Sequence, residues 1–289
     1  MYDTHGAELG ESMNCFQLIK TVLDEAYAAI PGKEAAKDAA IEEALGQLSK
    51  EYQKLREKGC LDYSDPVRRF AYIYRYTTSH ANLVYRVIGG SSDLRRLFSQ
   101  PKVTTACIGG GPGSDFLGIL KYCLRAKKAP ELKCQILDRD PAWGESWSDV
   151  DDKLGPSFRI STVFHPLDVT DAKTWTPFVK HFQADLFTLI YFMSEVYALR
   201  EPAAAYFETL MRSAKPGALM LYVDNNSSEF TTWFDKLARD HGWTILSKAC
   251  GDHQLPFEEE KSDLAPYINK FTPPKIRANI AYRVARKNA

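Results

Sequence analysis

The sequence predicts an α/β protein with a doubly wound, mostly parallel sheet that follows a helical appendage. Residues 1–100 carry apolar side chains at helical spacing, whereas residues 101–289 alternate short apolar runs with amphipathic stretches. Strands that alternate with helices in this way are typical of parallel sheets covered by helices on both faces. A glycine-rich run at 109–113 joins the first apolar run to a helical pattern, as expected after the first strand of such a sheet. We therefore divide the chain near residue 100.

Length and composition fit one large core plus an appendage, since the chain has 289 residues and is 45% hydrophobic. No apolar run reaches the roughly 20 residues needed to cross a bilayer, so we expect no membrane partner. The first ten residues include acidic side chains and no basic, apolar leader. We expect no targeting peptide and a cytoplasmic location, with the nucleus as the alternative. The six cysteines form no Cys-x-x-Cys pair, so we expect reduced thiols and no metal site.

The charge balance argues against a dedicated nucleic-acid binder, because 37 basic residues match 37 acidic ones. The segment 270–289 is an exception, with six basic residues and no acidic one. It could form a local basic patch or an ordinary solvated strand edge.

Three helices are predicted ahead of the sheet, over 14–30, 35–58 and 65–90. The second has apolar residues at alternating steps of four and three and stops at Gly59. The third starts with Asp65 as N-cap and Pro66 in its first turn.

The third predicted helix is rich in aromatic side chains, with Tyr72, Tyr74, Tyr76 and His80. One side of a helix cannot bury all four, so we expect at least one to face a cleft. Tyr76 and His80 are four residues apart and share a face. They could line a pocket and take part in catalysis, or they could be the polar tips of residues that pack helices together.

The glycine run contains Gly109, Gly110, Gly111 and Gly113. Glycines permit positive φ and leave room for a ligand, and the helix that follows offers unpaired N–H groups. A dinucleotide fingerprint would need its third glycine at position 114, which is Ser114, so the spacing is Gly-x-Gly-x-Gly instead. The run predicts a turn across which a flat, polar ligand lies.

This spacing resembles motif I of the class I S-adenosylmethionine (SAM) methyltransferases. Four further segments occur in the family's order: a strand 133–138, a strand 158–164, an apolar strand 185–192 like motif IV, and a Lys-Pro-Gly turn at 215–217 before a fifth strand. The resemblance implies a seven-stranded sheet whose last strand, near 278–285, is antiparallel. The alternating Ile280, Tyr282 and Val284 support that strand.

The resemblance also implies a SAM site. Asp138 would accept hydrogen bonds from the ribose hydroxyls, Asp168 would accept from the adenine amino group, and the backbone N–H of Val169 would meet the ring. Phe192 would face the transferred methyl group. The acidic residue that often opens motif I is Cys107 here, so Asp115 or an N-terminal residue is expected to help bind the methionine end.

Two nearby aspartates have other expected roles. Asp140 should face water or cap the helix that begins at Pro141, and Asp171 could be the N-cap of a helix over 172–182.

For activity, the resemblance implies methyl transfer from SAM to a nitrogen or oxygen acceptor. Glu195 could orient or deprotonate that acceptor, or it could cap the next helix. Met193 and Asn225 are the expected acceptor contacts, and residues 1–100 would form a lid that recognises the substrate, or a dimerisation surface. Of the possible acceptors, we favour a small molecule. The alternatives are methylation of RNA or protein, and a non-catalytic SAM-binding sensor or scaffold. The sequence predicts no oligomeric state.

Overall fold

The computed structural model describes residues 15–54, 62–128, 130–152, 159–254 and 261–289. Some expectations concern residues outside these ranges: the start of the chain at 1–10, the first residue of the helix 14–30, the end of the helix 35–58 with its stop at residue 59, and the first residue of the strand 158–164.

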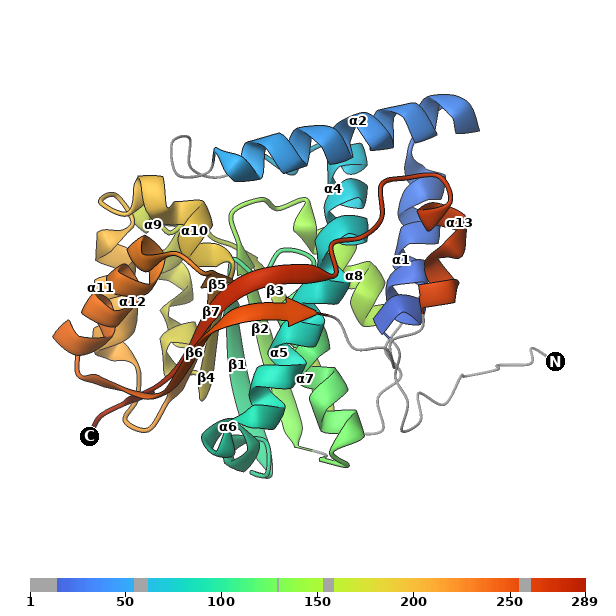
Figure 1. The fold of residues 1–289 in the computed structure, drawn as a ribbon. Helices are drawn as coiled ribbons and strands as arrows, with labels where there is room; N and C mark the ends of the chain where they lie inside the picture. Colours follow the sequence, from blue (N-terminus) through green and yellow to red (C-terminus); the bar gives the residue numbers. More distant parts are fainter. Residues whose placement is uncertain (1–14, 55–61, 129, 153–158, 255–260) are drawn as a thin grey trace.

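Seven strands form one sheet in the order β3-β2-β1-β4-β5-β7-β6 (Figure 1). Neighbours among β1 to β5 are parallel, whereas β7 is antiparallel to both β5 and β6. The strands are β1 (Lys102–Ile108), β2 (Glu131–Asp138), β3 (Ile160–Pro166), β4 (Leu186–Ile190), β5 (Leu219–Asn225), β6 (Trp243–Gln254) and β7 (Arg277–Lys287). The predicted seven-stranded, mostly parallel sheet with an antiparallel last strand is confirmed.

Helices cover both faces of the sheet (Figure 1). On one side α7 (Ser114–Arg125) packs beneath α5 (Thr78–Gly90), and on the other lie α11 (Ala204–Ser213) and α12 (Ser228–Asp240). Every residue of β4 is buried, because both layers cover this central strand. The doubly wound arrangement is therefore confirmed. Shorter helical segments complete the sheet region: α8 (Trp143–Asp152), α9 (Ala172–Trp175), η2 (Thr176–Gln183), α10 (Phe192–Val196), η3 (Tyr197–Leu199), η4 (Lys261–Leu264) and α13 (Ala265–Ile268).

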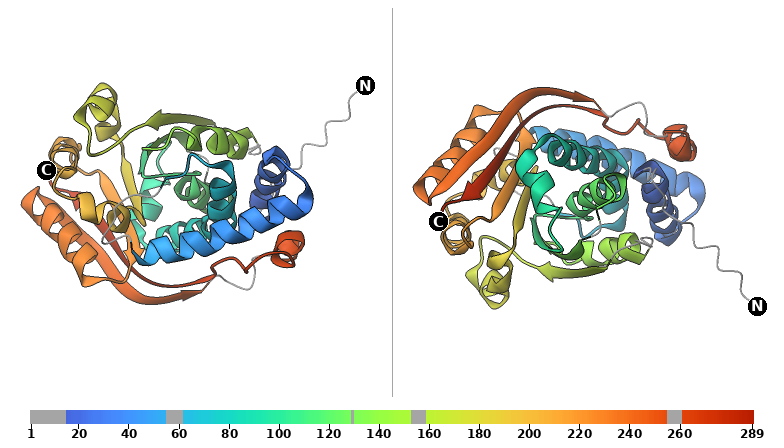
Figure 2. Two further views of the ribbon diagram at one scale, coloured as in Figure 1. Left: turned by 90° about the horizontal axis from the view of Figure 1, so that it is seen from above. Right: turned by 90° about the horizontal axis from the view of Figure 1, so that it is seen from below.

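The helical appendage comprises α1 (Cys15–Ala29), α2 (Glu34–Gln53), a long helical run over 66–90 and α6 (Ser92–Leu97). The run begins as predicted, with the Asp65 carboxylate accepting from the Val67 N–H. It consists of α4 (Pro66–Tyr72), the π-helical η1 (Ile73–Thr77) and α5. Figures 1 and 2 show α2 lying across the end of the sheet where the parallel strands finish.

The side chains singled out between residues 72 and 80 are all buried, at 8% exposure or less. The expectation that a helix could not bury all of them assumed that only one side of it was covered. Instead, several neighbours surround this run: Tyr74 lies 6.0 Å from Phe271, and Tyr72 lies 5.4 Å from Trp143 on α8.

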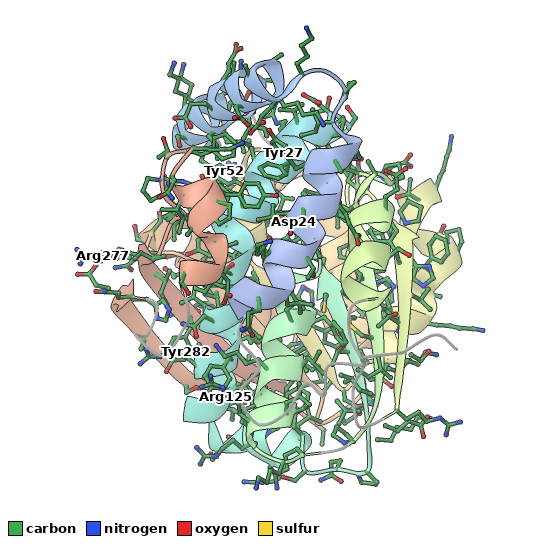
Figure 3. All side chains as sticks on the ribbon, turned by 90° about the vertical axis from the view of Figure 1, so that its right-hand side faces the viewer. Asp24, Tyr27, Tyr52, Arg125, Arg277 and Tyr282 are labelled. Carbon is green, nitrogen blue, oxygen red and sulfur yellow. The ribbon has the colours of Figure 1, made fainter. Side chains whose placement is uncertain are left out.

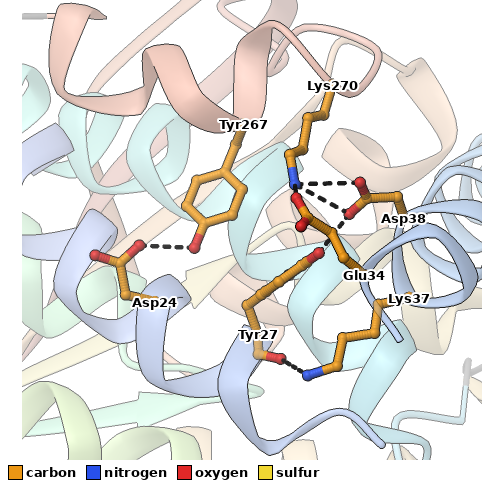
Figure 4. A network of polar contacts seen from close by, with 7 residues as sticks. All are labelled: Asp24, Tyr27, Glu34, Lys37, Asp38, Tyr267 and Lys270. Atoms are coloured by element: carbon orange, nitrogen blue, oxygen red, sulfur yellow. Dashed lines mark hydrogen bonds and ion pairs between the residues drawn. The ribbon is translucent and has the colours of Figure 1, made fainter. Parts of the chain in front are cut away.

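The connection from β6 to β7 returns past the appendage. The Tyr267 hydroxyl on α13 donates to Asp24 of α1 at 2.7 Å. Lys270 then pairs with Glu34 and Asp38 at the start of α2 (Figure 4). These contacts fix the segment 270–276 beside α2 and η1.

The basic residues of 270–289 do not gather into one patch. Arg283 pairs with Asp235 at 2.9 Å, and Lys287 donates to two backbone carbonyls. Arg277 is exposed and points away from the molecule (Figure 3). Residues 277–287 form β7, which lies between β5 and β6. The expectation of a solvated strand edge is therefore wrong, because this strand has a neighbour on each side.

Among the described residues, Cys107, Cys123, Cys134 and Cys250 are free thiols, and no three metal-ligating side chains cluster together. In the same part of the chain, no helix has both the length and the apolar character required to span a membrane.

Candidate functional site

The glycine run forms a tight turn between β1 and α7. Gly109, Gly111 and Gly113 have φ values of 66°, 45° and 79°, in the left-handed region that other residues avoid. The N–H groups of Gly109 and Gly110 donate to the Leu137 carbonyl at 2.8 and 3.2 Å, which ties the turn to the end of β2. The turn that the sequence predicted is therefore present.

Asp138, the last residue of β2, holds this turn in place. Its carboxylate accepts from the Gly111 N–H at 2.9 Å and from the Asp140 N–H at 3.1 Å. Burial raises the pKa of Asp138 to about 6, because its effect outweighs that of the two hydrogen bonds, which favour the charged carboxylate and lower the pKa.

Asp138 lines a small cavity at the carboxyl ends of β1 to β4, here named the glycine-loop cavity. Its lining residues are Tyr63, Ile108, Gly109, Leu137, Asp138, Arg139, Asp140, Leu167, Asp168, Val169, Phe192, Glu195 and Val196. Six of the predicted site residues thus meet in one place: Gly109, Asp138, Asp168, Val169, Phe192 and Glu195. This edge is where ligands bind in open α/β sheets.

The free volume of the glycine-loop cavity is only about 40 Å³, because Phe192 covers the glycine turn. A Cβ atom built on Gly109 would lie 2.1 Å from the Phe192 ring. Position 109 therefore requires glycine for two reasons, its positive φ and the ring above it.

The loop after β3 supplies Asp168, one of four carboxylates that line this cavity. Asp168 accepts from the Thr170 N–H and hydroxyl at 2.8 and 2.7 Å. Asp171 accepts from the Lys173 N–H and caps α9, as predicted, although the helix continues as the 3₁₀ segment η2.

Asp140 has a larger role than the sequence indicated. One carboxylate oxygen accepts from the Ala142 N–H and so caps the turn that leads into α8. The other accepts from the Tyr63 N–H at 2.9 Å. It therefore links the segment before α4 to the rim of the glycine-loop cavity.

Asp115 and Cys107 lie beneath the turn. Asp115 is 2% exposed, accepts from the Thr188 hydroxyl of β4, and lines neither of the cavities described here. Burial raises its pKa to about 7. The Cys107 sulfur lies 3.7 Å from that of Cys134, so this thiol faces β2 within the core.

The end of β4 departs from the sequence prediction. The strand stops at Ile190, two residues earlier than expected, and Tyr191 has a φ of 57° before α10 begins. Helical spacing then directs Phe192, Glu195 and Val196 into the glycine-loop cavity. Met193 points into the core beneath α11 and α12 and is fully buried. The expected acceptor contact by Met193 is therefore not supported.

A second, larger cavity of about 550 Å³ lies under α2 and is here named the helical cavity. It is lined by Ser49, Tyr52, Arg75, Tyr76, His80, Tyr191, Ser194, Asn225, Phe230 and Lys275. Three of these, Tyr76, His80 and Asn225, were predicted from the sequence.

One wall of the helical cavity is a stack of rings. The His80 ring stacks on Tyr191 at 4.2 Å and on Tyr76 at 5.8 Å. Burial lowers the pKa of His80 to about 3, and the nearby charge of Lys275 adds to this effect. The imidazole is therefore neutral at physiological pH.

The two cavities meet at a hydrogen-bonded group of three side chains. The Tyr52 hydroxyl, from the helical cavity, donates to Glu195 at 3.0 Å and lies 2.9 Å from the Tyr63 hydroxyl. Glu195 and Tyr63 both line the glycine-loop cavity. Burial, with a smaller contribution from Asp138, raises the pKa of Glu195 to about 8.

Sequence reasoning missed Tyr52, Tyr63, Arg75 and Lys275. Tyr52 lies on the apolar stripe of a helix, where it looks like any core residue. Its partner Glu195 is 143 residues away, so no local spacing connects them.

No family model matches the chain, and no curated protein matches it. Several solved structures are similar to it. A SAM-dependent methyltransferase from Methanosarcina mazei is 12% identical, with a TM-score of 0.45, over 68% of this chain and 97% of that one. A precorrin-6y C5,15-methyltransferase from Geobacter metallireducens is 13% identical, with a TM-score of 0.40, over 68% and 85%.

A tRNA m1G37 methyltransferase from M. jannaschii is 10% identical, with a TM-score of 0.39, over 72% of this chain and 49% of that one. At such identities the likeness concerns the fold alone. The fold assignment rests on the chain's own features: its sheet order, the antiparallel β7 and the glycine turn after β1. The chain has the fold of the class I SAM-dependent methyltransferases.

Proposed function

We propose that the protein is a SAM-dependent methyltransferase that transfers a methyl group to a nitrogen or oxygen atom of a small molecule. One observation carries the proposal: a cavity between the glycine turn, Asp138 and Asp168 adjoins a larger cavity, with Glu195 between the two. The first has the groups that a nucleoside requires, and the second has room for an acceptor.

The residues of the glycine-loop cavity fit SAM. The half-buried Asp138 carboxylate would accept from the ribose hydroxyls, and Asp168 and Val169 would hold the adenine. Glycine at position 109 would leave the backbone open to the ligand once the Phe192 ring has moved away. The present volume is far below the ~300 Å³ of ordinary ligand pockets. Binding therefore requires Phe192 to leave its place over Gly109.

The bound sulfonium would supply the methyl group, and its transfer to a lone pair needs alignment and exclusion of water more than covalent help. The helical cavity would align the acceptor against the ring wall of Tyr76, His80 and Tyr191. Asn225 would contact it from the end of β5.

Glu195 would receive the acceptor's proton through Tyr52. The Tyr52 hydroxyl already donates a hydrogen bond to the Glu195 carboxyl. Tyr52 can therefore pass its own proton to Glu195 while it takes one from the acceptor. A pKa near neutrality suits a group that takes up and releases protons. Positive charge in the glycine-loop cavity would lower this pKa and favour the accepting form.

The helical cavity has a volume of about 550 Å³, which is the size of a small-molecule site and supports such an acceptor over RNA or protein. Lys270 pairs with Glu34, and Arg283 pairs with Asp235. These ion pairs neutralise part of the basic segment that favoured RNA.

Calorimetry with SAM tests the cofactor site. Asp138→Ala should weaken binding about ten- to hundredfold, because two ribose hydroxyls lose their acceptor. Asp171→Ala is the matched control, since this aspartate caps α9 and lines neither cavity. Equal affinity of both variants and the parent would show that Asp138 does not hold the ribose.

A further inference from the structure

The helical cavity contains two cationic side chains and no carboxylate among its lining residues. Arg75 comes from η1, and Lys275 comes from the segment that leads into β7. Burial lowers the pKa of Lys275, and the like charge of Arg75 adds a smaller effect in the same direction. Among the described residues, neither side chain forms an ion pair. Glu195 does not line this cavity and accepts a hydrogen bond from Tyr52, which does.

The backbone holds these two residues together. The Lys275 N–H donates to the Arg75 carbonyl at 2.9 Å, and the Arg75 guanidinium donates to the Pro273 carbonyl. Upstream, Lys270 is fixed by Glu34 and Asp38 (Figure 4). Because the two cations are already held in place, little conformational entropy is lost when an anion binds between them.

The cations adjoin the ring wall. The Lys275 ammonium lies 5.8 Å from the centre of the Tyr76 ring, which also stands 5.1 Å from Tyr52. The stack continues through His80 to Tyr191. A planar group that lay on this wall would have positive charge near it and the Tyr52 hydroxyl close by.

We propose that the acceptor is a small aromatic acid: a planar ring with a hydroxyl or amino nucleophile and a carboxylate that Lys275 and Arg75 bind. This inference rests on the proposed function. The carboxylate would neutralise the two cations, the ring would lie against the wall at Tyr76, and the nucleophile would face Tyr52. Charge-assisted hydrogen bonds of this kind are the strong ones in proteins.

Binding of defined probes to the full chain, without SAM, tests the inference. The probes are 3-hydroxybenzoate, 3-aminobenzoate and the neutral 3-hydroxybenzamide, measured by calorimetry at low and high salt. The anions should bind at least about tenfold more tightly than the amide, and added salt should weaken only the anions. Equal affinities, or no anion binding at millimolar concentration, would overturn the proposal.

Lys275→Met should lose about tenfold in affinity for the benzoates and leave the amide unchanged. Lys248→Met is the control, because Lys248 is an exposed lysine on β6 that lies outside the cavity. Lys275→Gln serves as a second variant if the methionine variant does not fold. Unchanged benzoate affinity in the folded variant would contradict the role of Lys275.

Two further probes separate the alternatives. If 3-hydroxyphenyl phosphate binds more tightly than the benzoates, the ligand is an aromatic phosphate and not an aromatic acid. If an RNA oligonucleotide binds and the benzoates do not, the ligand is RNA. SAM binding that depends on Asp138, with no benzoate binding, would overturn this inference and leave the cofactor site standing. Benzoate binding without SAM binding would leave an aromatic-acid site standing but overturn the cofactor site, and with it the assignment of the bound acid as a methyl acceptor.

Discussion

Tyr191 is the residue at which the two cavities divide. Its φ of 57° is costly for a side chain with a Cβ, about 1–2 kcal/mol. Its N–H donates to the Val223 carbonyl at 2.7 Å, and its ring stacks on His80. The sharp change of direction that results sends Phe192 toward the glycine turn while the Tyr191 ring faces the helical cavity. Strain held at such a position is typical of functional sites.

Glu195 should make stability depend on pH. Its folded pKa of about 8 lies above the value of 4.5 for a free carboxyl, so the folded state keeps a proton that the unfolded state releases. The stability that this proton provides is full at acid pH and is lost as the pH rises through about 8. Glu195→Gln keeps the neutral form at every pH.

Urea denaturation at about pH 5 and pH 8.5 measures this effect. The parent and Glu195→Gln should be similarly stable at the lower pH, and the variant should be more stable by at least about 1 kcal/mol at the higher one. Asp115, Asp138 and Asp224 also have raised pKa values, so the comparison with the variant isolates the effect of Glu195. A difference that is constant with pH would contradict a protonated Glu195.

At the scale of elements, α5 and α7 join the appendage to the sheet. A Cβ on Gly118 of α7 would lie 2.4 Å from the Ala81 carbonyl oxygen of α5, so only glycine permits this approach. Residues of both helices also share one buried cluster with β1. The appendage is therefore packed as part of the same core.

Gly118→Ala should destabilise the protein by about 1–3 kcal/mol, because the Ala81 carbonyl oxygen and the stiff Val84 side chain both oppose the added atom. Gly46→Ala is the matched control. Gly46 lies in the helix α2 with nothing within 4 Å of its Cβ position, so alanine should be neutral or stabilise by up to about 1 kcal/mol. Thermal unfolding compares the two, and equal midpoints would contradict the close packing of α5 on α7.

The sequence predicted those elements that depend on local pattern. The glycine turn, Asp138 at the end of β2 and the Asp65 cap are each specified within a few residues. The early end of β4 was missed, because an apolar run does not reveal a positive φ at Tyr191. The π-helical η1 was missed for a similar reason, since its apolar residues continue a helical spacing.

At the scale of the whole molecule, the helical cavity exists because distant segments meet. Tyr52 meets Glu195 across 143 residues, and Lys275 meets Arg75 across the full sheet region. No spacing in the sequence reports such contacts, so Tyr52, Arg75 and Lys275 could not be predicted as lining residues, although Tyr76, His80 and Asn225 were. The predicted division at residue 100 and the lid role of residues 1–100 remain predictions, although α2 does cover the end of the sheet (Figure 2).

Transfer of a labelled methyl group tests the central claim most directly. The full chain is incubated with methyl-labelled SAM and with separate small-molecule, RNA and protein fractions of a cell extract, and each fraction is analysed for label and for a mass gain of one methylene. The account predicts labelling of a compound in the small-molecule fraction, lost in Asp138→Ala and retained in Asp171→Ala. Labelling confined to RNA or protein, or none in any fraction despite SAM binding, would contradict it.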